Sequence, residues 1–96
     1  MSLTLHERFE QFESEYLRFD RVETKLSKRA DLHAFILLDQ LVPQSIDMIA
    51  GADHDVIYLE VEPSQLEKVA TDDHILDLYR CGVHFSTEYD CLVMFV

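Results

Sequence analysis

The C-terminal segment 91–96 constrains the fold of this chain more than any other part of it. Its residues, Cys-Leu-Val-Met-Phe-Val, include no charged side chain, and most of them favour strands. Because successive side chains of a strand point to opposite faces of a sheet, this strand needs cover on both sides. As an exposed edge it would promote aggregation. We therefore predict that 91–96 lies in the middle of a sheet or against another subunit, which favours a homo-oligomer.

A first helix is predicted to begin after Thr4. Thr4 and Glu7 match the Thr-x-x-Glu capping box, in which the side chain of each residue bonds to the backbone amide of the other. Large apolar residues then recur at alternating spacings of four and three, which places them on one helix face. They are Leu5, Phe9, Phe12, Tyr16 and Phe19. This stripe indicates core packing or, alternatively, a short seam between two copies of the chain.

A second helix and a strand follow. Asp31 is a suitable N-cap, and Pro43 ends the helix because the residue before a proline disfavours helical backbone. This helix is apolar on more than half of its circumference, so we expect it to be central. Residues 43–55 are predicted to form a loop, and Val56–Val61 a strand.

A third helical region occupies most of the remaining chain. It is predicted to start at Pro63 or Ser64, because proline suits a first helical turn and because Ser64 with Glu67 gives a second capping box. Thr71 restarts or continues the helix, with two acidic residues behind it at the favourable end of the dipole. Gly82 then ends it as a C′ residue.

Strands 83–87 and 91–96 are predicted to close the chain as a β-hairpin that turns near residues 88–90. The order helix, helix, strand, helix, strand, strand predicts a single α+β domain over residues 1–96. Its helices would pack on one face of a small three-stranded sheet. A helical crossover joins strand 56–61 to strand 83–87, so these two can be parallel neighbours.

The two cysteines are predicted to be free thiols in a reducing compartment. Cys81 and Cys91 lie at opposite ends of the hairpin, on the order of 15 Å apart at ~3.3 Å per residue. A disulfide needs Cα atoms within about 7 Å. Acidic residues interrupt the apolar positions of the N-terminus, which argues against a signal peptide. No apolar run approaches the roughly eighteen residues of a membrane span. We therefore expect a cytoplasmic protein.

The net charge of −11 is carried entirely by residues 30–96. That part has thirteen acidic residues against Lys68 and Arg80, whereas the charges of residues 1–29 cancel. An acidic body repels nucleic acid and acidic membranes and attracts basic proteins. The leading hypothesis is a non-catalytic interaction module that binds a basic protein, such as one that itself binds nucleic acid. The candidate protein-binding residues are Asp53, Asp55, Glu60, Glu62, Asp72 and Asp73.

A basic segment, residues 18–29, supports a second hypothesis. It is the one place where a phosphate or a nucleotide would dock, with Tyr16 and Phe19 nearby for stacking. Asp20 and Glu23 interrupt it, which makes it a poor nucleic-acid site. A small anionic ligand at a subunit boundary remains an alternative, as do ion pairs with the acidic body. The candidate anion-binding residues are Arg18, Arg21, Lys25, Lys28 and Arg29.

The third hypothesis, an enzyme, has the least support. His54 between two aspartates and His74 behind two more are suitable ligands for a divalent metal. A site joining them requires that the two ends of their elements meet. We expect no metal, no cofactor and no catalytic residue.

Catalysis by a cysteine has little support either. Cys81 or Cys91 with His84 or His33 would form the nucleophile pair. Cys81 follows a predicted helix C-terminus and Cys91 follows an aspartate, and both settings disfavour the thiolate. The chain also has only two glycines and no glycine-rich phosphate loop.

Several segments resemble the small, acidic, uncharacterised proteins of tailed phages and prophages. They are His6-Glu-Arg-Phe-Glu-Gln-Phe-Glu, Asp31-Leu-His-Ala-Phe, Ala52-Asp-His-Asp-Val-Ile-Tyr-Leu-Glu-Val and Leu78-Tyr-Arg-Cys-Gly-Val. None of them is a functional motif. The resemblance implies a context, namely an accessory protein that acts on host proteins or small host signals in the host cytoplasm.

Overall fold

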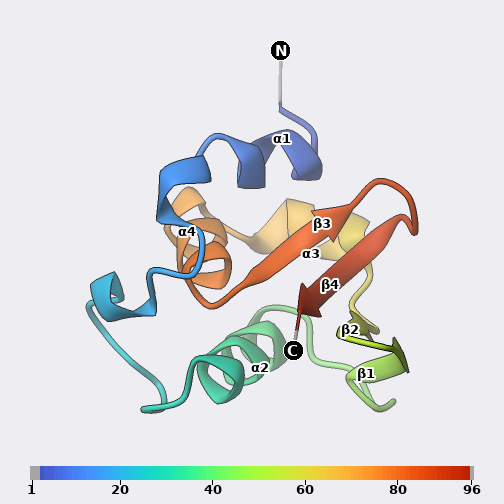
Figure 1. Ribbon diagram of the computed structural model, residues 1–96. Coiled ribbons are helices and arrows are strands. Elements are labelled where there is room, and N and C mark those ends of the chain that lie inside the picture. Colours follow the sequence, from blue (N-terminus) through green and yellow to red (C-terminus); the bar gives the residue numbers. More distant parts are fainter. Residues whose placement is uncertain (1–2, 96) are drawn as a thin grey trace.

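Two β-hairpins lie side by side in one sheet. The computed structural model describes residues 3–95, and Figure 1 shows the arrangement of the elements. The first hairpin is β1 (Ile49–Asp53) with β2 (Val56–Leu59), and the second is β3 (Val83–Ser86) with β4 (Cys91–Phe95). β2 pairs with β4, so the strand order is β1-β2-β4-β3 and every neighbouring pair is antiparallel.

The prediction of a three-stranded sheet is wrong, because residues 49–53 of the predicted loop form a strand. Their sequence, Ile-Ala-Gly-Ala-Asp, has little strand propensity of its own. Pairing with β2 across a two-residue turn supplies the hydrogen bonds that hold it extended. His54 occupies that turn with a φ of 54°, a left-handed conformation that tight hairpin turns require.

The last strand lies in the middle of the sheet, as predicted, and its final residue Val96 lies outside the described residues. The prediction that strand 56–61 and strand 83–87 are parallel neighbours is wrong. The crossover carries the chain past the neighbouring position to the far edge, where β3 forms. β4 then turns back between β3 and β2, so that both backbone edges of β4 are paired and neither is exposed.

The first helix is shorter than predicted. α1 (Leu5–Glu10) begins with the predicted capping box of Thr4 and Glu7. The chain then continues through two 3₁₀ turns, η1 (Glu13–Glu15) and η2 (Phe19–Arg21). Leu17 between them has a φ of 62°, which a right-handed helix cannot contain. All five residues of the apolar stripe nevertheless pack on the core, because the short turns keep them on one side.

α2 (Ala30–Leu41) starts one residue before its predicted N-cap. Arg29 is the N-cap residue, and the carboxylate of Asp31 accepts a hydrogen bond from the Leu32 amide instead. The helix ends before Pro43, as predicted. Leu32 and Ile36 remain exposed on it, so α2 packs on one side only and is less central than expected.

The third helical region is two helices, α3 (Pro63–Val69) and α4 (Asp72–Arg80). The capping box predicted at Ser64 is wrong: Glu62 is the N-cap residue, and the Ser64 hydroxyl donates to its carboxylate. The capping box lies instead at the start of α4, where the side chains of Thr71 and His74 each accept a hydrogen bond from the other's backbone amide. Gly82 follows α4 with a φ of 98°, as a C′ glycine should.

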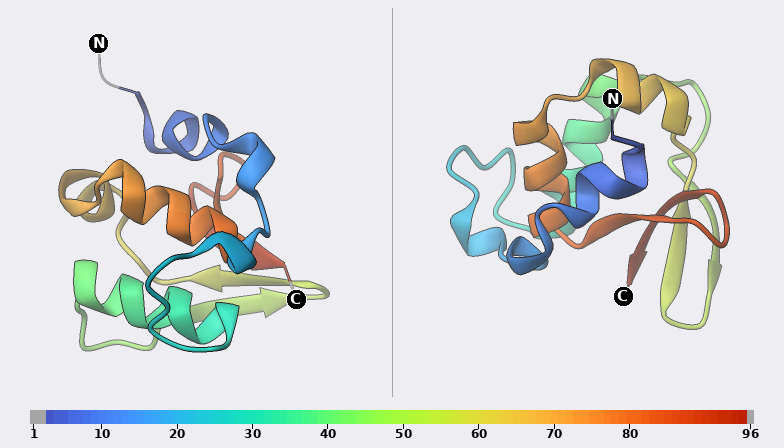
Figure 2. Two further views of the ribbon diagram at one scale, coloured as in Figure 1. Left: turned by 90° about the vertical axis from the view of Figure 1, so that its left-hand side faces the viewer. Right: turned by 90° about the horizontal axis from the view of Figure 1, so that it is seen from above.

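The helices gather on one side of the sheet, which confirms the α+β class (Figure 2). The inner face of the sheet contributes Leu59, Val83, Leu92 and Met94, all buried. The fully buried side chains of the helices are Phe9, Leu38, Leu66, Ile75 and Leu78. The outer face has Tyr58, Val93 and His84 in one register across β2, β4 and β3. Within residues 3–95, no helix is both long enough and apolar enough to cross a bilayer.

Candidate functional site

The six acidic candidates do not form one surface. Asp53 and Asp55 belong to the β1–β2 turn, whereas Asp72 and Asp73 start α4. The turn and the start of α4 lie at opposite ends of the molecule in both views of Figure 2. Asp72 is also partly neutralised, because its carboxylate lies 3.5 Å from the guanidinium of Arg8. The two aspartate pairs therefore cannot contact the same small partner surface.

Glu60 and Glu62 do line a common groove. They follow β2, and together with Asp90 of the β3–β4 turn they border a cavity of about 190 Å³. Glu62 and Asp90 also border a larger cavity of about 640 Å³, with Glu67 of α3. We call Glu60, Glu62, Glu67 and Asp90 the carboxylate groove. Glu67, which sequence analysis named only for a helix cap, and Asp90 are not among the candidate binding residues, because only the fold brings α3 and the β3–β4 turn together.

The walls of the two groove cavities hold little positive charge, although Glu67 also borders a neighbouring cavity with Arg8 and Lys68. Among the described residues, neither cavity has a lysine or an arginine in its wall. None of the four carboxylates forms an ion pair within residues 3–95, and the only neutral donor bonded to one of them is the Ser64 hydroxyl on Glu62. A cation that enters the groove would therefore find carboxylates that no internal base already neutralises.

An aromatic pocket opens beside the groove. Its volume is about 200 Å³, and it shares His6 and Phe85 with the wall of the larger groove cavity. Four ring pairs run through it in sequence. The centroid distances are 5.9 Å for Phe9–Tyr79, 5.0 Å for Tyr79–Tyr16, 5.9 Å for Tyr16–His84 and 5.1 Å for His84–Phe95. The pocket thus extends from a buried ring to an exposed one.

Four separate elements and one loop position these rings. Phe9 comes from α1, Tyr79 from α4, His84 from β3 and Phe95 from β4. Tyr16 lies between the two 3₁₀ turns, where the amide of its neighbour Leu17 donates to the Tyr79 carbonyl at 3.2 Å. That hydrogen bond fixes the loop against the end of α4. The stripe pattern indicated Phe9 and Tyr16, and the predicted hairpin brings His84 near Phe95, but the packing of that hairpin against α1 and α4 was not predicted.

The rings of the pocket are neutral and its one carboxylate is Glu10, among the described residues that line it. Burial raises the pKa values of Tyr16 and Tyr79. Burial also lowers the pKa of His84, against the opposing charge of Glu10. Glu10 lies 3.3 Å from the imidazole of His6. At neutral pH the pocket therefore combines electron-rich ring faces with one negative charge.

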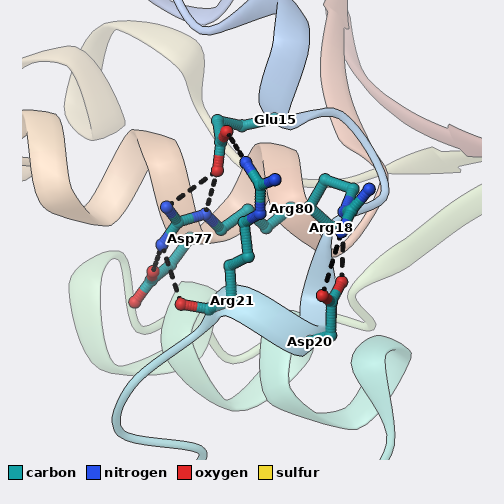
Figure 3. Close-up of polar contacts among 6 residues, drawn as sticks. All are labelled: Glu15, Arg18, Asp20, Arg21, Asp77 and Arg80. Atoms are coloured by element: carbon teal, nitrogen blue, oxygen red, sulfur yellow. Dashed lines mark hydrogen bonds and ion pairs between the residues drawn. The ribbon is translucent and has the colours of Figure 1, made fainter.

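The basic segment, residues 18–29, is partly paired within the chain. Arg18 donates to both oxygens of Asp20, and Arg21 pairs with Glu15 (Figure 3). Lys25 donates to the Val22 carbonyl at 2.7 Å and lies over the ring of Phe19. Lys28 and Arg29 form no ion pair within the described part of the chain. Two of the five candidates, Arg18 and Arg21, are thus paired with carboxylates of the described chain, and Lys25 is held only by a carbonyl and a ring.

Arg80, which sequence analysis did not single out, holds the N-terminal segment to α4. Two of its nitrogens donate to one carboxylate oxygen of Glu15, at 3.0 and 2.8 Å, and a third donates to the Arg21 carbonyl (Figure 3). The hydrogen bonds from Arg80 hold the pKa of Glu15 below its ordinary value, and Arg21 adds to the effect. This cluster is a structural clamp, and it places Tyr16 in the aromatic pocket.

The two histidines considered for a metal site are far apart. His54 lies in the β1–β2 turn and His74 in the first turn of α4, at opposite ends of the molecule (Figure 2). Nδ1 of His74 accepts a hydrogen bond from the Thr71 amide, which occupies a ligand position. Within residues 3–95, no three side chains of the ligand types lie close enough to hold a metal ion.

Both cysteines are unsuited to thiolate chemistry. Burial raises the pKa of Cys81 to about 12, and nearby Asp77 and Asp31 act in the same direction. Burial also raises the pKa of Cys91, with Asp90 and Glu60 adding to it. Both are free thiols. Each is protonated at neutral pH, so the environment disfavours the nucleophilic form.

His33 makes the stability of the protein sensitive to mild acid. Only 1% of it is exposed, and its Nδ1 accepts a hydrogen bond from the Leu26 amide at 3.0 Å. Burial lowers its pKa below the ordinary 6.5, opposed by the charge of Asp77 and assisted by that of Lys25. A group whose pKa is lower in the folded state stabilises the fold fully above its ordinary pKa, and this contribution is lost as the pH falls.

We therefore expect the melting temperature to fall between about pH 7.5 and about pH 5, and to fall less in His33→Asn. The asparagine oxygen retains an acceptor for the Leu26 amide but does not titrate. The lowered pKa of His84 adds to this loss of stability at low pH, as that of His33 does. The raised pKa of Asp77 has the opposite effect on stability. The matched control is exposed His54→Asn. An equal drop in the wild type and in His33→Asn, followed by circular dichroism, would contradict this assignment.

Comparison with models of known protein families finds no match to this chain. The comparisons with curated proteins and with solved structures find no match either. The function therefore has to be inferred from the chemistry of the surface itself.

Proposed function

We propose that this chain is a non-catalytic interaction module that binds a basic protein through the carboxylate groove and the adjoining aromatic pocket. The observation that carries the proposal is the set of four unpaired carboxylates around cavities without a lysine or an arginine. Elsewhere the described acidic residues are partly matched, as Asp72 is by Arg8 and Glu15 is by Arg80.

The charge of the whole molecule supports the same partner. A net charge of −11 on 96 residues accelerates encounter with a basic surface and slows encounter with a polyanion. The groove then determines where the partner binds, because its carboxylates surround a concave surface. The carboxylates of the β1–β2 turn do not line that surface. Long-range attraction of a basic partner depends on the net charge of the protein. Binding in the groove depends in addition on which carboxylates line it.

The biological setting of the proposal comes from the resemblance to small acidic phage proteins. It makes the partner a basic host protein, met in the host cytoplasm. Self-association is also expected, and Tyr89, which packs beside Tyr58 of β2 and is more than half exposed, offers surface for it. The alternative, an anion site in the basic segment, is weaker because Arg18 and Arg21 are paired internally with carboxylates.

Two double variants with the same change in net charge test the proposal. Glu62→Gln with Asp90→Asn removes two charges from the groove, and Asp53→Asn with Asp55→Asn removes two from the β1–β2 turn. The probe is a fluorescein-labelled peptide of arginine and lysine separated by glycine and serine, measured by anisotropy. At about 0.1 M salt, charges more than roughly 10 Å away are largely screened, so only the groove pair should act on a peptide in the groove.

We expect the groove pair to weaken peptide binding about 3- to 10-fold, which corresponds to two partly exposed ion pairs. The turn pair should change the affinity less than about 2-fold. The asparagine at position 90 should fold well, because Asp90 has a φ of 54°, a conformation that asparagine tolerates. Equal weakening by both pairs, or no binding by the wild type, would overturn the proposal.

A further inference from the structure

We propose that the aromatic pocket receives one arginine side chain of the basic partner. This inference rests on the proposed function, and it names what enters the pocket beside the carboxylate groove. The volume of the aromatic pocket distinguishes a small-molecule ligand from a single side chain. About 200 Å³ is below the roughly 300–1,000 Å³ of small-molecule and cofactor sites. It suits a single side chain that reaches in from a bound protein.

The chemistry of the wall selects a cation. The faces of aromatic rings attract positive charge, and the linked rings of Tyr79, Tyr16, His84 and Phe95 present several of them. Glu10 adds a carboxylate at the same opening, held 3.3 Å from His6 and 55% exposed. An apolar side chain would make no use of that charge, whereas a cationic one would pair with it.

The geometry favours arginine over lysine. The guanidinium is planar, so it stacks on a ring while its N–H groups bond to a carboxylate in the same plane. The rings of His84 and Phe95 lie 31° from parallel with centroids 5.1 Å apart, so they stack partly on each other, and Phe95 forms the exposed part of the pocket wall. Lysine offers a compact, strongly hydrated charge that cannot use such a wall as fully.

Phe95 is the exposed member of the ring series. It is 57% exposed and contacts His84, whereas Phe9 at the other end of the series is buried. An arginine stacked there would cover the Phe95 ring and pair with Glu10. The carboxylate groove shares His6 and Phe85 with the pocket, so a basic segment lying in the groove passes its mouth.

The test uses three forms of the labelled peptide that differ at one central residue, which is arginine, lysine or the neutral isostere citrulline. Phe95→Leu keeps an apolar side chain but removes the ring face, and Glu10→Gln removes the charge. The matched controls are Tyr89→Leu, an exposed ring that pairs with Tyr58 outside the pocket, and Glu88→Gln. Circular dichroism establishes that each variant is folded before affinities are compared.

We expect Phe95→Leu and Glu10→Gln each to weaken the arginine peptide about 3- to 30-fold. The same variants should barely change the affinity of the citrulline peptide. The affinity loss of the lysine peptide should lie between those of the arginine and citrulline peptides. The controls should leave all three affinities unchanged. Equal loss of the arginine and citrulline peptides in Phe95→Leu would overturn the inference, since it would mean that the pocket takes apolar groups. So would a citrulline peptide that binds the wild type as tightly as the arginine peptide.

A direct titration separates this inference from the proposed function. N-acetyl-arginine methylamide added to ¹⁵N-labelled protein should shift the amide signals of His84 and Phe95 in the wild type but not in Phe95→Leu. The citrulline analogue should not shift them. If the groove variants weaken peptide binding while the pocket variants do not, the result supports the proposed function and contradicts the arginine pocket. If Phe95→Leu lowers the mass in sedimentation without changing peptide affinity, a second copy occupies the pocket, which also overturns the inference.

Discussion

Replacing Phe9 by alanine is expected to lower the free energy of unfolding by about 3–5 kcal/mol, the range for deleting a buried phenylalanine. Phe9 is 1% exposed, and its ring packs 5.9 Å from that of Tyr79. α1 has only six residues, so it cannot be stable as an isolated helix and depends on this contact. A domain of this size has a total stability of about 5–15 kcal/mol, so the variant should lose a large part of it.

Phe12→Ala is the matched control for this prediction. Phe12 belongs to the same apolar stripe, but it lies beyond α1 and is only partly buried against the core. The same atoms are removed, so the difference between the two variants measures burial alone. We expect Phe12→Ala to cost less than half as much in urea denaturation followed by circular dichroism. Similar losses would contradict the assignment of Phe9 as the residue that anchors α1.

Gly82→Ala is expected to cost about 2–3 kcal/mol, for two separable reasons. The backbone φ of Gly82 is 98°, which residues with a Cβ rarely adopt. A Cβ at this position would also lie 2.8 Å from Cδ2 of Leu17, well inside a normal contact. Gly82 connects α4 to β3, so the strain acts where Tyr79 and His84 are placed in the aromatic pocket.

Gly51→Ala provides the contrast, since it is the other glycine of the chain. A Cβ there would meet Cδ2 of Tyr58 at an ordinary 3.8 Å, and no positive φ is involved. We expect this variant to be neutral or slightly stabilising in the same urea experiment. Adding Leu17→Ala to Gly82→Ala should recover only the part of the loss that comes from the close contact. Full recovery would show that the backbone conformation costs nothing.

The candidate site was only half predictable. The excess of acidic residues indicated a basic partner, and Glu60 and Glu62 were among the candidates. The pairs Asp53–Asp55 and Asp72–Asp73 were equally acidic in sequence, and only the fold places them at opposite ends. The charged segment 18–29 likewise suggested an anion site, because internal pairing, such as that of Arg21 with Glu15, depends on how the loop folds back.

Local rules determined the starts and ends of several elements from sequence alone. The capping box at Thr4, the stop before Pro43 and the C′ glycine at position 82 all depend on contacts within a few residues. The central place of the last strand also followed from sequence, because an apolar strand is disfavoured at an exposed edge, although Phe95 at its end stays exposed. These features follow from local bonding or from composition.

The tertiary structure decided what depends on partners distant in the chain. β1 is a strand because β2 pairs with it, and β3 lies at the edge because β4 occupies the place beside β2. The aromatic pocket needs residues from α1, α4, β3 and β4, which no spacing in the sequence relates. A sequence pattern specifies which face a side chain occupies on its own element. Which faces then meet depends on the free energy of the whole packed core.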